Sequence, residues 1–236
     1  MCGVTGPLVD SHVIPQALHV DMQNASEGAE TLEIYSDLRS YSLRSRTGVY
    51  GQYVCSDCEG RFHPWDEAGI EFVRGHRTGD AGADLPGGRR NGFYAQVDYP
   101  NFKLWVMSLL WRANACQHPL FRRVQLGEKW TDVLTNFLTN EDPGTSEDFS
   151  VSASWFTDDV ARFFMADPHR EKYDQINYYR FYVYGGFTFL IKVDQRRSTQ
   201  KFAEFQLDES GELAVLARRL SPSESRVANR VLSGHD

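Results

Sequence analysis

The stretch GVYGQYVCSDCEGRFHPW, residues 48–65, decides how the first third of the chain folds. Residues 48–55 alternate and are rich in β-branched and aromatic side chains, which predicts a strand that ends at a pair of cysteines. Cys55 and Cys58 are three residues apart, the spacing at which one tight turn brings two thiolates to a single Zn²⁺. A short helix is predicted after Pro64, because proline suits a first helical turn. The stretch therefore predicts a strand, a metal-binding turn and a helix in succession.

A third thiol, Cys2, stands near the start of the chain and is predicted to join Cys55 and Cys58 around a structural zinc ion. A structural zinc takes four ligands, and His12, His63 and Cys116 are the candidates for the fourth. Two alternatives stay open. The thiols are redox-active, although flanking acidic residues oppose the lowered thiol pKa that this needs, or they are unligated and simply fill space.

The composition indicates a protein of the cytoplasm. The 236 residues are 41% hydrophobic, yet no apolar run approaches the ~18 residues that span a bilayer, and the first residues lack the pattern of a signal peptide. We therefore expect no membrane association and a reducing compartment, in which paired cysteines more often bind metal than form disulfides.

A net charge of −7 argues against a protein that coats DNA, because phosphate contacts need basic surface. It leaves room for a nuclease, for which a local basic strip and a metal suffice. Four basic clusters would supply such a strip for nucleic acid, or are simply solvated: Arg39-Arg44-Arg46, Arg89-Arg90, Arg122-Arg123 and Arg218-Arg219.

Residues 75–91 are rich in Gly, Asp and Arg and predict a boundary between two parts of the chain. We expect a zinc-binding module over residues 1–80 and an α+β domain over residues 92–236. Apolar residues at helical spacing predict a helical hairpin within residues 100–140, with an apolar face on each helix. Its helices are expected to begin after Pro100 and to stop at the turn 141–144.

Residues 149–220 predict a mainly antiparallel β region. A strand is expected over residues 150–156 and a short helix near residues 160–164. Two hairpins follow, one around Gly185-Gly186 and one that joins residues 201–207 to residues 212–217. Ser221-Pro222-Ser223-Glu224 has the pattern of a capping box at the start of a helix. The order of elements predicts the α+β class.

Asp10-Ser11-His12-Val13-Ile14-Pro15, followed by Cys55-x-x-Cys58, resembles the HNH-type, or ββα-metal, proteins. The chain also resembles an uncharacterised bacterial family with SHxIP and CxxCExxF motifs, here residues 11–15 and 55–62, followed by Trp65-Asp66 and a Trp-rich helix. The resemblance covers roughly residues 1–125. This second resemblance implies no established activity, whereas the resemblance to HNH-type proteins implies a zinc-stapled ββα module and a metal-dependent nuclease or nuclease-derived effector. By analogy alone, bacterial antiviral defence is a setting for such a protein.

The resemblance implies roles for specific residues. His12 would be the general base that activates water, Asp10 would orient it or touch metal, and a Mg²⁺ or Mn²⁺ ion near Asp10 and His63 would polarise the phosphodiester. The chain departs from the family pattern at two positions. Ser11 precedes the histidine where active nucleases carry an acid, and Glu59 follows the second cysteine where they carry asparagine or histidine.

Two further functions come from other features. The opening Met1-Cys2-Gly3-Val4 resembles the start of class II glutamine amidotransferases, in which the N-terminal cysteine is the nucleophile of a hydrolase. Gly75-His76-Arg77 and Asn91-Gly92 faintly match the substrate motifs of that family. The third hypothesis is a non-catalytic, zinc-stabilised module with a protein partner on the C-terminal sheet. Seven aromatic residues alternate there, so half of them would face outward unless both faces are covered: Tyr178, Tyr179, Phe181, Tyr182, Tyr184, Phe187 and Phe189.

Overall fold

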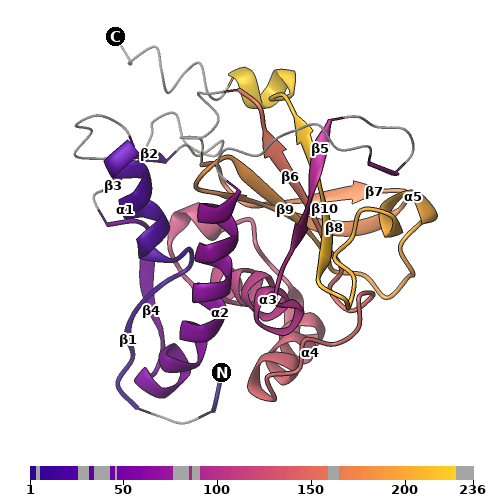
Figure 1. Cartoon of the computed structure of the whole chain (residues 1–236). Helices are drawn as coiled ribbons and strands as arrows, with labels where there is room; N and C mark the ends of the chain where they lie inside the picture. The colour runs from indigo at the N-terminus through magenta and orange to yellow at the C-terminus, as the bar shows by residue number, and fades with distance from the viewer. Residues whose placement is uncertain are drawn as a thin grey trace.

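The computed structural model describes residues 1–3, 6–25, 32–34, 43–45, 47–76, 85–86, 91–158 and 165–226. Its helices and strands confirm the α+β class (Figure 1). The helices are α1 (Gln16–Ala25), α2 (Ser56–Gly75), α3 (Tyr99–Ala115), a 3-10 turn (Pro119–Phe121), α4 (Gly127–Thr139) and α5 (Gln200–Ala203). The strands are β1 (Val9–His12), β2 (Leu32–Ile34), β3 (Leu43–Ser45), β4 (Tyr50–Val54), β5 (Gly92–Gln96), β6 (Val151–Phe156), β7 (His169–Tyr173), β8 (Ile176–Val183), β9 (Phe187–Lys192) and β10 (Glu212–Arg218).

Helix α3 lies at the centre of the molecule, between α2 and the large sheet (Figure 1). Thirteen of its 17 residues are buried, so it is apolar on almost its whole circumference rather than on one stripe. Trp105 contacts Phe189 of β9 on one side, and Gly69 of α2 on the other. A Cβ on Gly69 would lie 2.1 Å from the Trp105 ring, so only glycine lets α2 and α3 approach this closely.

The large sheet has the strand order β5-β10-β6-β9-β8-β7. All neighbouring strands are antiparallel except β10 and β6, which run parallel with Leu216 opposite Ser154. One face, with Phe181, Phe187 and Phe189, packs on α3 and α2. One hydrophobic core therefore includes residues of both predicted parts of the chain, from Val13 to Ala217.

The N-terminal part contains two antiparallel strands followed by a helix. β1 pairs with β4, with His12 opposite Tyr50, and β4 leads directly into α2. This helix is longer than predicted, because it begins at Ser56, beside the cysteines, and carries Pro64 in its interior. An interior proline costs about 3 kcal/mol. Burial of Phe62, Trp65 and Phe72 on the α3 side offsets this cost, at roughly 2 kcal/mol for each large apolar side chain.

The other predicted elements have mixed outcomes. The strand at residues 50–54, the helices α3 and α4, the strand β6 and the β8–β9 hairpin are confirmed. The capping box is confirmed too, because the Ser221 amide donates to Glu224 Oε2 and the Glu224 amide to Ser221 Oγ. Helix α1 was not predicted, since its sequence is polar and weakly periodic. The helix expected near residues 160–164 lies outside the described residues.

The hairpin predicted from residues 201–207 and 212–217 is wrong. Residues 200–203 form the short helix α5, and Gln206 makes only an isolated bridge to Ser152. The Asp208 carboxylate then accepts hydrogen bonds from the Ser210 and Glu212 amides and turns the chain into β10. Strand β10 takes its partners from β5 and β6, which lie far away in sequence, so local pattern did not reveal its pairing.

The aromatic row of the C-terminal sheet is buried. Each of the seven residues from Tyr178 to Phe189 is at most 4% exposed. Tyr179 and Phe181 face the core, whereas Tyr178 and Tyr182 face the opposite side and are covered by Phe202 and Phe156. Cover on both faces was the alternative considered above, so the sheet offers no exposed aromatic row to a partner.

Arg112 near the end of α3 joins the N-terminal strands to the core. Its guanidinium is 1% exposed and donates two hydrogen bonds to the Asp66 carboxylate of α2, at 2.5 and 3.1 Å. It also donates to the His12 carbonyl at 3.0 Å and to Ser108 Oγ at 2.7 Å. The Phe62 ring packs against it at 4.5 Å. One buried cation therefore connects β1, α2 and α3.

Lys103 of α3 is a second buried cation, with no exposed surface. Its Nζ donates to the Thr145 carbonyl at 3.2 Å. Burial lowers the pKa of this amine to about 7, and the carboxylates of Asp148, Glu209 and Glu147 offset the desolvation only in part.

We predict that Arg112→Met destabilises the protein by about 3–5 kcal/mol, because it leaves the Asp66 carboxylate half-buried without its counterion. Arg74→Met is the matched control. Arg74 pairs with Asp21 on the surface and should cost no more than about 1 kcal/mol. Urea denaturation of the three proteins measures both free energies, and equal losses would contradict the organising role of Arg112.

We predict that the free energy of unfolding rises between pH 7 and 9, by at most about 1.4 kcal/mol for each pH unit from Lys103. In this window the unfolded amine binds a proton that the folded one, with its pKa lowered to about 7, has released. Below pH 7 the amine is protonated in both states and the gain is absent. Lys103→Met should flatten the profile, whereas Lys129→Met, at an exposed position, should leave it unchanged. Urea denaturation at pH 7, 8 and 9 makes the comparison.

Candidate metal centre

The three predicted cysteine ligands lie together. The Sγ atoms of Cys2, Cys55 and Cys58 are all within 4.8 Å of one another, and those of Cys2 and Cys55 are 3.6 Å apart. Among the described residues this is the only group of three or more possible metal ligands. Three converging thiols near the start of the chain are compatible with a bound zinc ion.

Local structure at the start of α2 positions two of these thiols. Cys55 is the N-cap residue with extended backbone, and Cys58 lies in the first turn, where it is buried. The unpaired amides and dipole of a helix N-terminus stabilise negative charge, as three thiolates around a dication would carry. Burial, together with the neighbouring thiols, raises the pKa of Cys58 to about 11, so a cation is what would draw the proton from this thiol near neutral pH.

The structure separates the candidates for a fourth ligand from this cluster. His63 belongs to α2 but is exposed, and its Nε2 lies 3.3 Å from Glu67. Cys116 is buried at the end of α3, against Gly51. His12 bonds to a backbone carbonyl. The described part of the chain thus provides three ligands, which leaves the fourth position to water or to a group outside that part.

The predicted catalytic residues lie on one face of β1. Asp10 and His12 point to the same side of the strand, because side chains two residues apart do so. Asp10 accepts a hydrogen bond from Gln52 at 3.0 Å, and His12 Nε2 lies 2.9 Å from the Thr47 carbonyl. Neither forms a group of metal ligands with His63 within the described residues. The structure therefore does not bring Asp10, His12 and His63 into one site.

The opposite face of β1 points toward α2 and is filled with side chains. Ser11 is fully buried there and donates a hydrogen bond to the Tyr53 hydroxyl at 3.0 Å. The Arg112 guanidinium, with Asp66, occupies the space between β1 and α2. Sequence reasoning missed Arg112, because an arginine at the end of an apolar helix ordinarily reads as a surface residue. The available signal was its spacing. Arg112 follows Ser108 by four residues and Trp105 by seven, so the three side chains lie on the same face of α3.

The amidotransferase hypothesis concerns Cys2, which is exposed and has two other thiols as neighbours. The described residues of the faint substrate motifs lie at the end of α2, for Gly75 and His76, and at the start of β5, for Asn91 and Gly92. His76 stacks on Phe93 at 5.3 Å and bonds to the Phe72 carbonyl, so it is part of the packing at the end of α2. Arg77 lies outside the described residues. The surroundings of Cys2 are those of a metal ligand more than those of a lone nucleophile.

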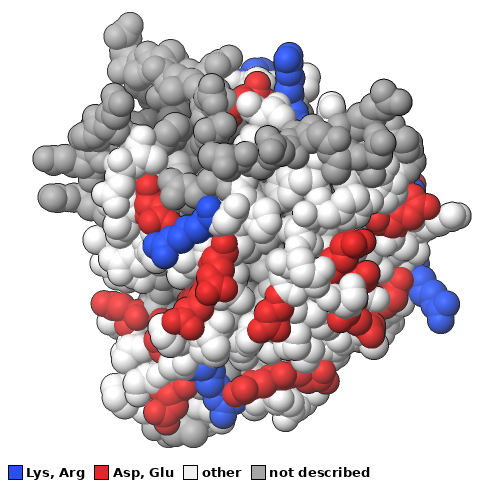
Figure 2. Space-filling model, viewed as in Figure 1, with Lys and Arg blue, Asp and Glu red and all other residues white. Residues whose placement is uncertain are grey.

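The surface over α2 and α4 is acidic. Figure 2 shows more acidic than basic side chains on this face of the molecule. The exposed acids of the two helices include Asp57, Glu67, Glu71, Glu128 and Asp132. Two of the predicted basic clusters have no described side chains: Arg39-Arg44-Arg46 and Arg89-Arg90. Arg218 is paired with Glu224. The acidic face disfavours a phosphate backbone.

No helix within the described residues is long and apolar enough to cross a membrane. Comparison with protein-family models, with curated proteins and with solved structures gave no significant match to this chain. A functional assignment for this protein therefore rests on the geometry of the site.

Proposed function

We propose that Cys2, Cys55 and Cys58 bind one structural zinc ion, and that residues 1–76 form a zinc-stabilised interaction module for a protein partner. The observation that supports this choice is that the buried Arg112–Asp66 pair fills the space between β1 and α2. The nuclease hypothesis needs Asp10, His12 and His63 around one metal ion, whereas this pair holds α2 against the opposite face of β1 and His63 lies apart from the other two.

Electrostatics support this choice. The Asp66 carboxylate already neutralises Arg112 and has no further charge to offer a metal. A structural zinc at the cysteines avoids the conflict, because it lies at the other end of the strand–helix junction, beside the N-cap of α2.

The zinc ion would act as a structural cross-link. It would tie the first residues of the chain to the point at which β4 ends and α2 begins, and so fix the start of β1 against its partner strand. β1 and β4 form only a two-stranded sheet, which is marginal without further support. The acidic outer face of α2 and α4 then favours a protein over a nucleic acid as the partner.

One observation favours a metal-dependent nuclease as the second candidate. His12 Nε2 bonds to the Thr47 carbonyl, which fixes the proton on Nε2 and leaves Nδ1 as a hydrogen-bond acceptor. An imidazole oriented in this way is suited to act as a general base. Asp10, on the same face of β1, would then be the nearest acidic group for a Mg²⁺ or Mn²⁺ ion.

We predict one tightly held zinc ion per chain, measured by elemental analysis of untagged protein. Cys55→Ser should lose the zinc and unfold the N-terminal module, because binding of a structural metal contributes directly to folding. Cys116→Ser is the matched control, since this buried thiol lies outside the cluster and its loss should leave the zinc in place. Folded wild-type protein without zinc would contradict the site.

We predict no cleavage of DNA or RNA by the zinc-loaded protein with added Mg²⁺ or Mn²⁺, and no change in His12→Ala. Cleavage by the wild type that is lost in His12→Ala would replace the interaction module with the nuclease. Cleavage that persists in His12→Ala would contradict the interaction module and also remove the role of His12. Gel assays on circular plasmid and on single-stranded RNA distinguish these outcomes, with Tyr50→Phe as a control beside His12.

A further inference from the structure

A cavity of about 330 Å³ lies on the face of the large sheet that is turned away from α3. Its floor comes from β6, β8, β9 and β10, and α5 forms one wall. The volume falls in the range of sites for small organic molecules. The proposed function makes no use of this cavity, since the cysteines and the N-terminal strands belong to other elements.

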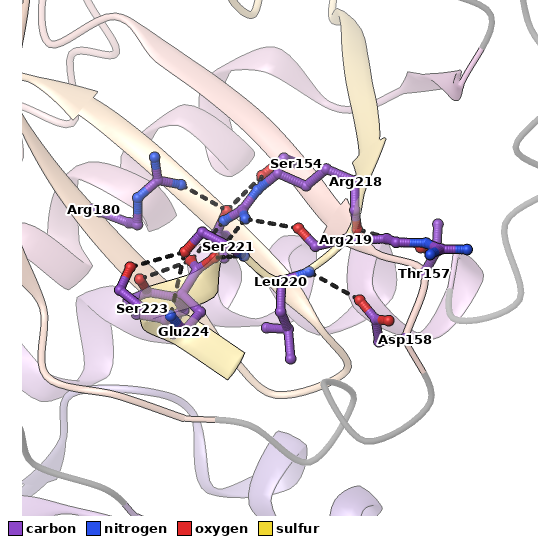
Figure 3. Close-up of polar contacts among 12 residues, drawn as sticks. Ser154, Thr157, Asp158, Arg180, Arg218, Arg219, Leu220, Ser221, Ser223 and Glu224 are labelled. Carbon is purple, nitrogen blue, oxygen red and sulfur yellow. Dashed lines mark hydrogen bonds and ion pairs between the residues drawn. The ribbon is translucent and has the colours of Figure 1, made fainter. Parts of the chain in front are cut away.

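The floor carries a row of hydrogen-bonding side chains across four adjacent strands. Arg218 Nε of β10 donates to Ser154 Oγ of β6 at 3.1 Å, and Ser154 Oγ lies 2.6 Å from Thr188 Oγ1 of β9. Arg180 Nη1 of β8 donates to the same Thr188 oxygen at 3.3 Å. The strand order β10-β6-β9-β8 thus produces one continuous chain, with a guanidinium at each end and two hydroxyls between. Figure 3 shows Ser154 and Arg218 in this row, with Arg180 nearby.

Each guanidinium is held from behind by one carboxylate. Glu171 accepts from Arg180 at 2.6 and 2.9 Å, and hydrogen bonds from His169 and Arg180 hold the pKa of Glu171 well below its usual range despite burial. Glu224 accepts from Arg218 at 2.7 and 2.9 Å and is itself fixed by the capping box at Ser221 (Figure 3). The arginines are therefore both ionised and rigid, as a preorganised binding site requires.

Donor capacity remains at both ends of the row. An arginine side chain has five N–H donors. Among the described residues, the bonds of Arg180 to Glu171, Tyr173 and Thr188 use four of them. The bonds of Arg218 to Ser154, Glu224 and the Arg219 carbonyl likewise use four. One N–H on each guanidinium is left for an acceptor in the cavity, together with one hydroxyl proton of the Ser154–Thr188 pair.

Apolar side chains form another part of the lining. Leu190 and Leu216 come from the sheet, and Phe202 and Phe205 from α5 and the residues that follow it. The Phe202 ring is held in place by Tyr178, at 5.2 Å in a stacked arrangement. A flat apolar group would bury its surface against these side chains while an acceptor group reaches the polar row.

The charges limit the ligand to a monoanion. Three cationic side chains line the cavity, Arg180, Lys201 and Arg218, and one carboxylate, Asp174. Glu171 and Glu224 behind the arginines bring the carboxylates to three as well, and His169 also pairs with Glu171, which raises the pKa of this imidazole. The cavity therefore carries little excess positive charge for a polyphosphate. A single carboxylate suits two guanidinium donors, because its two oxygens can each accept from a different arginine.

We infer that this cavity binds a small monocarboxylic acid with a flat apolar body, with the carboxylate on the Arg180–Thr188–Ser154–Arg218 row and the body against Phe202 and Leu190. Ligand-observed NMR and calorimetry on the full, zinc-loaded chain test this with three probes. Benzoate should bind, its neutral isostere benzamide should bind at least about tenfold more weakly, and inorganic phosphate should not bind. Benzoate that does not bind, or that binds no better than benzamide or phosphate, overturns the inference.

Variants locate the site. Leu190→Trp fills the cavity while it keeps both arginines in the chain, and it should abolish benzoate binding. Arg218→Lys keeps the charge but loses the planar fork and should weaken binding by about tenfold or more. Arg196→Lys is the matched control, since Arg196 forms its ion pair with Asp194 away from the cavity. Circular dichroism verifies the fold of each variant. Benzoate binding that survives Leu190→Trp in folded protein overturns the assignment to this cavity, whatever the outcome of the zinc and cleavage experiments.

Discussion

The buried ion pair between Arg112 and Asp66 is the interaction on which the arrangement of the N-terminal part depends. It lies at the meeting point of β1, α2 and α3, and it also holds the His12 carbonyl. Isolated, a two-stranded sheet and a helix interrupted by a proline would be poor building blocks. They become stable here because the guanidinium and the apolar surface of α3 fix both of them. The same pair explains why the nuclease-like residues on β1 face away from α2.

Three arginine–carboxylate pairs have different consequences because their surroundings differ. Arg112 has its bonds inside the core and connects elements. Arg180 and Arg218 are held by Glu171 and Glu224, but each keeps one side toward a cavity. Breaking a buried ion pair strongly destabilises the fold, whereas an ion pair partly exposed beside a cavity can also contact a ligand. The cysteine cluster and the cavity thus lie at two separate places on one continuous core.

Much of the fold could be predicted where local pattern and final environment agree. The periodicity of α3 and α4, the alternation around Gly185-Gly186 and the capping box at Ser221 all require only neighbours in sequence. The prediction failed at residues 201–207, where an apolar run suggested a strand but the chain forms α5 and crosses to β10. It also placed the start of α2 too late, since Pro64 reads as a helix start unless the burial of Phe62 and Trp65 is known.

The sequence by itself determined the α+β class and the three thiols, because cysteine spacing and residue periodicity are local properties of the chain. Only the tertiary structure decided which residues share a site. It separated His63 from the cysteines and placed Arg112 between β1 and α2. It also aligned Arg218, Ser154, Thr188 and Arg180 across four strands. The physical reason is that strand order and helix packing are set by burial of the whole core, and no local pattern encodes which distant strands become neighbours.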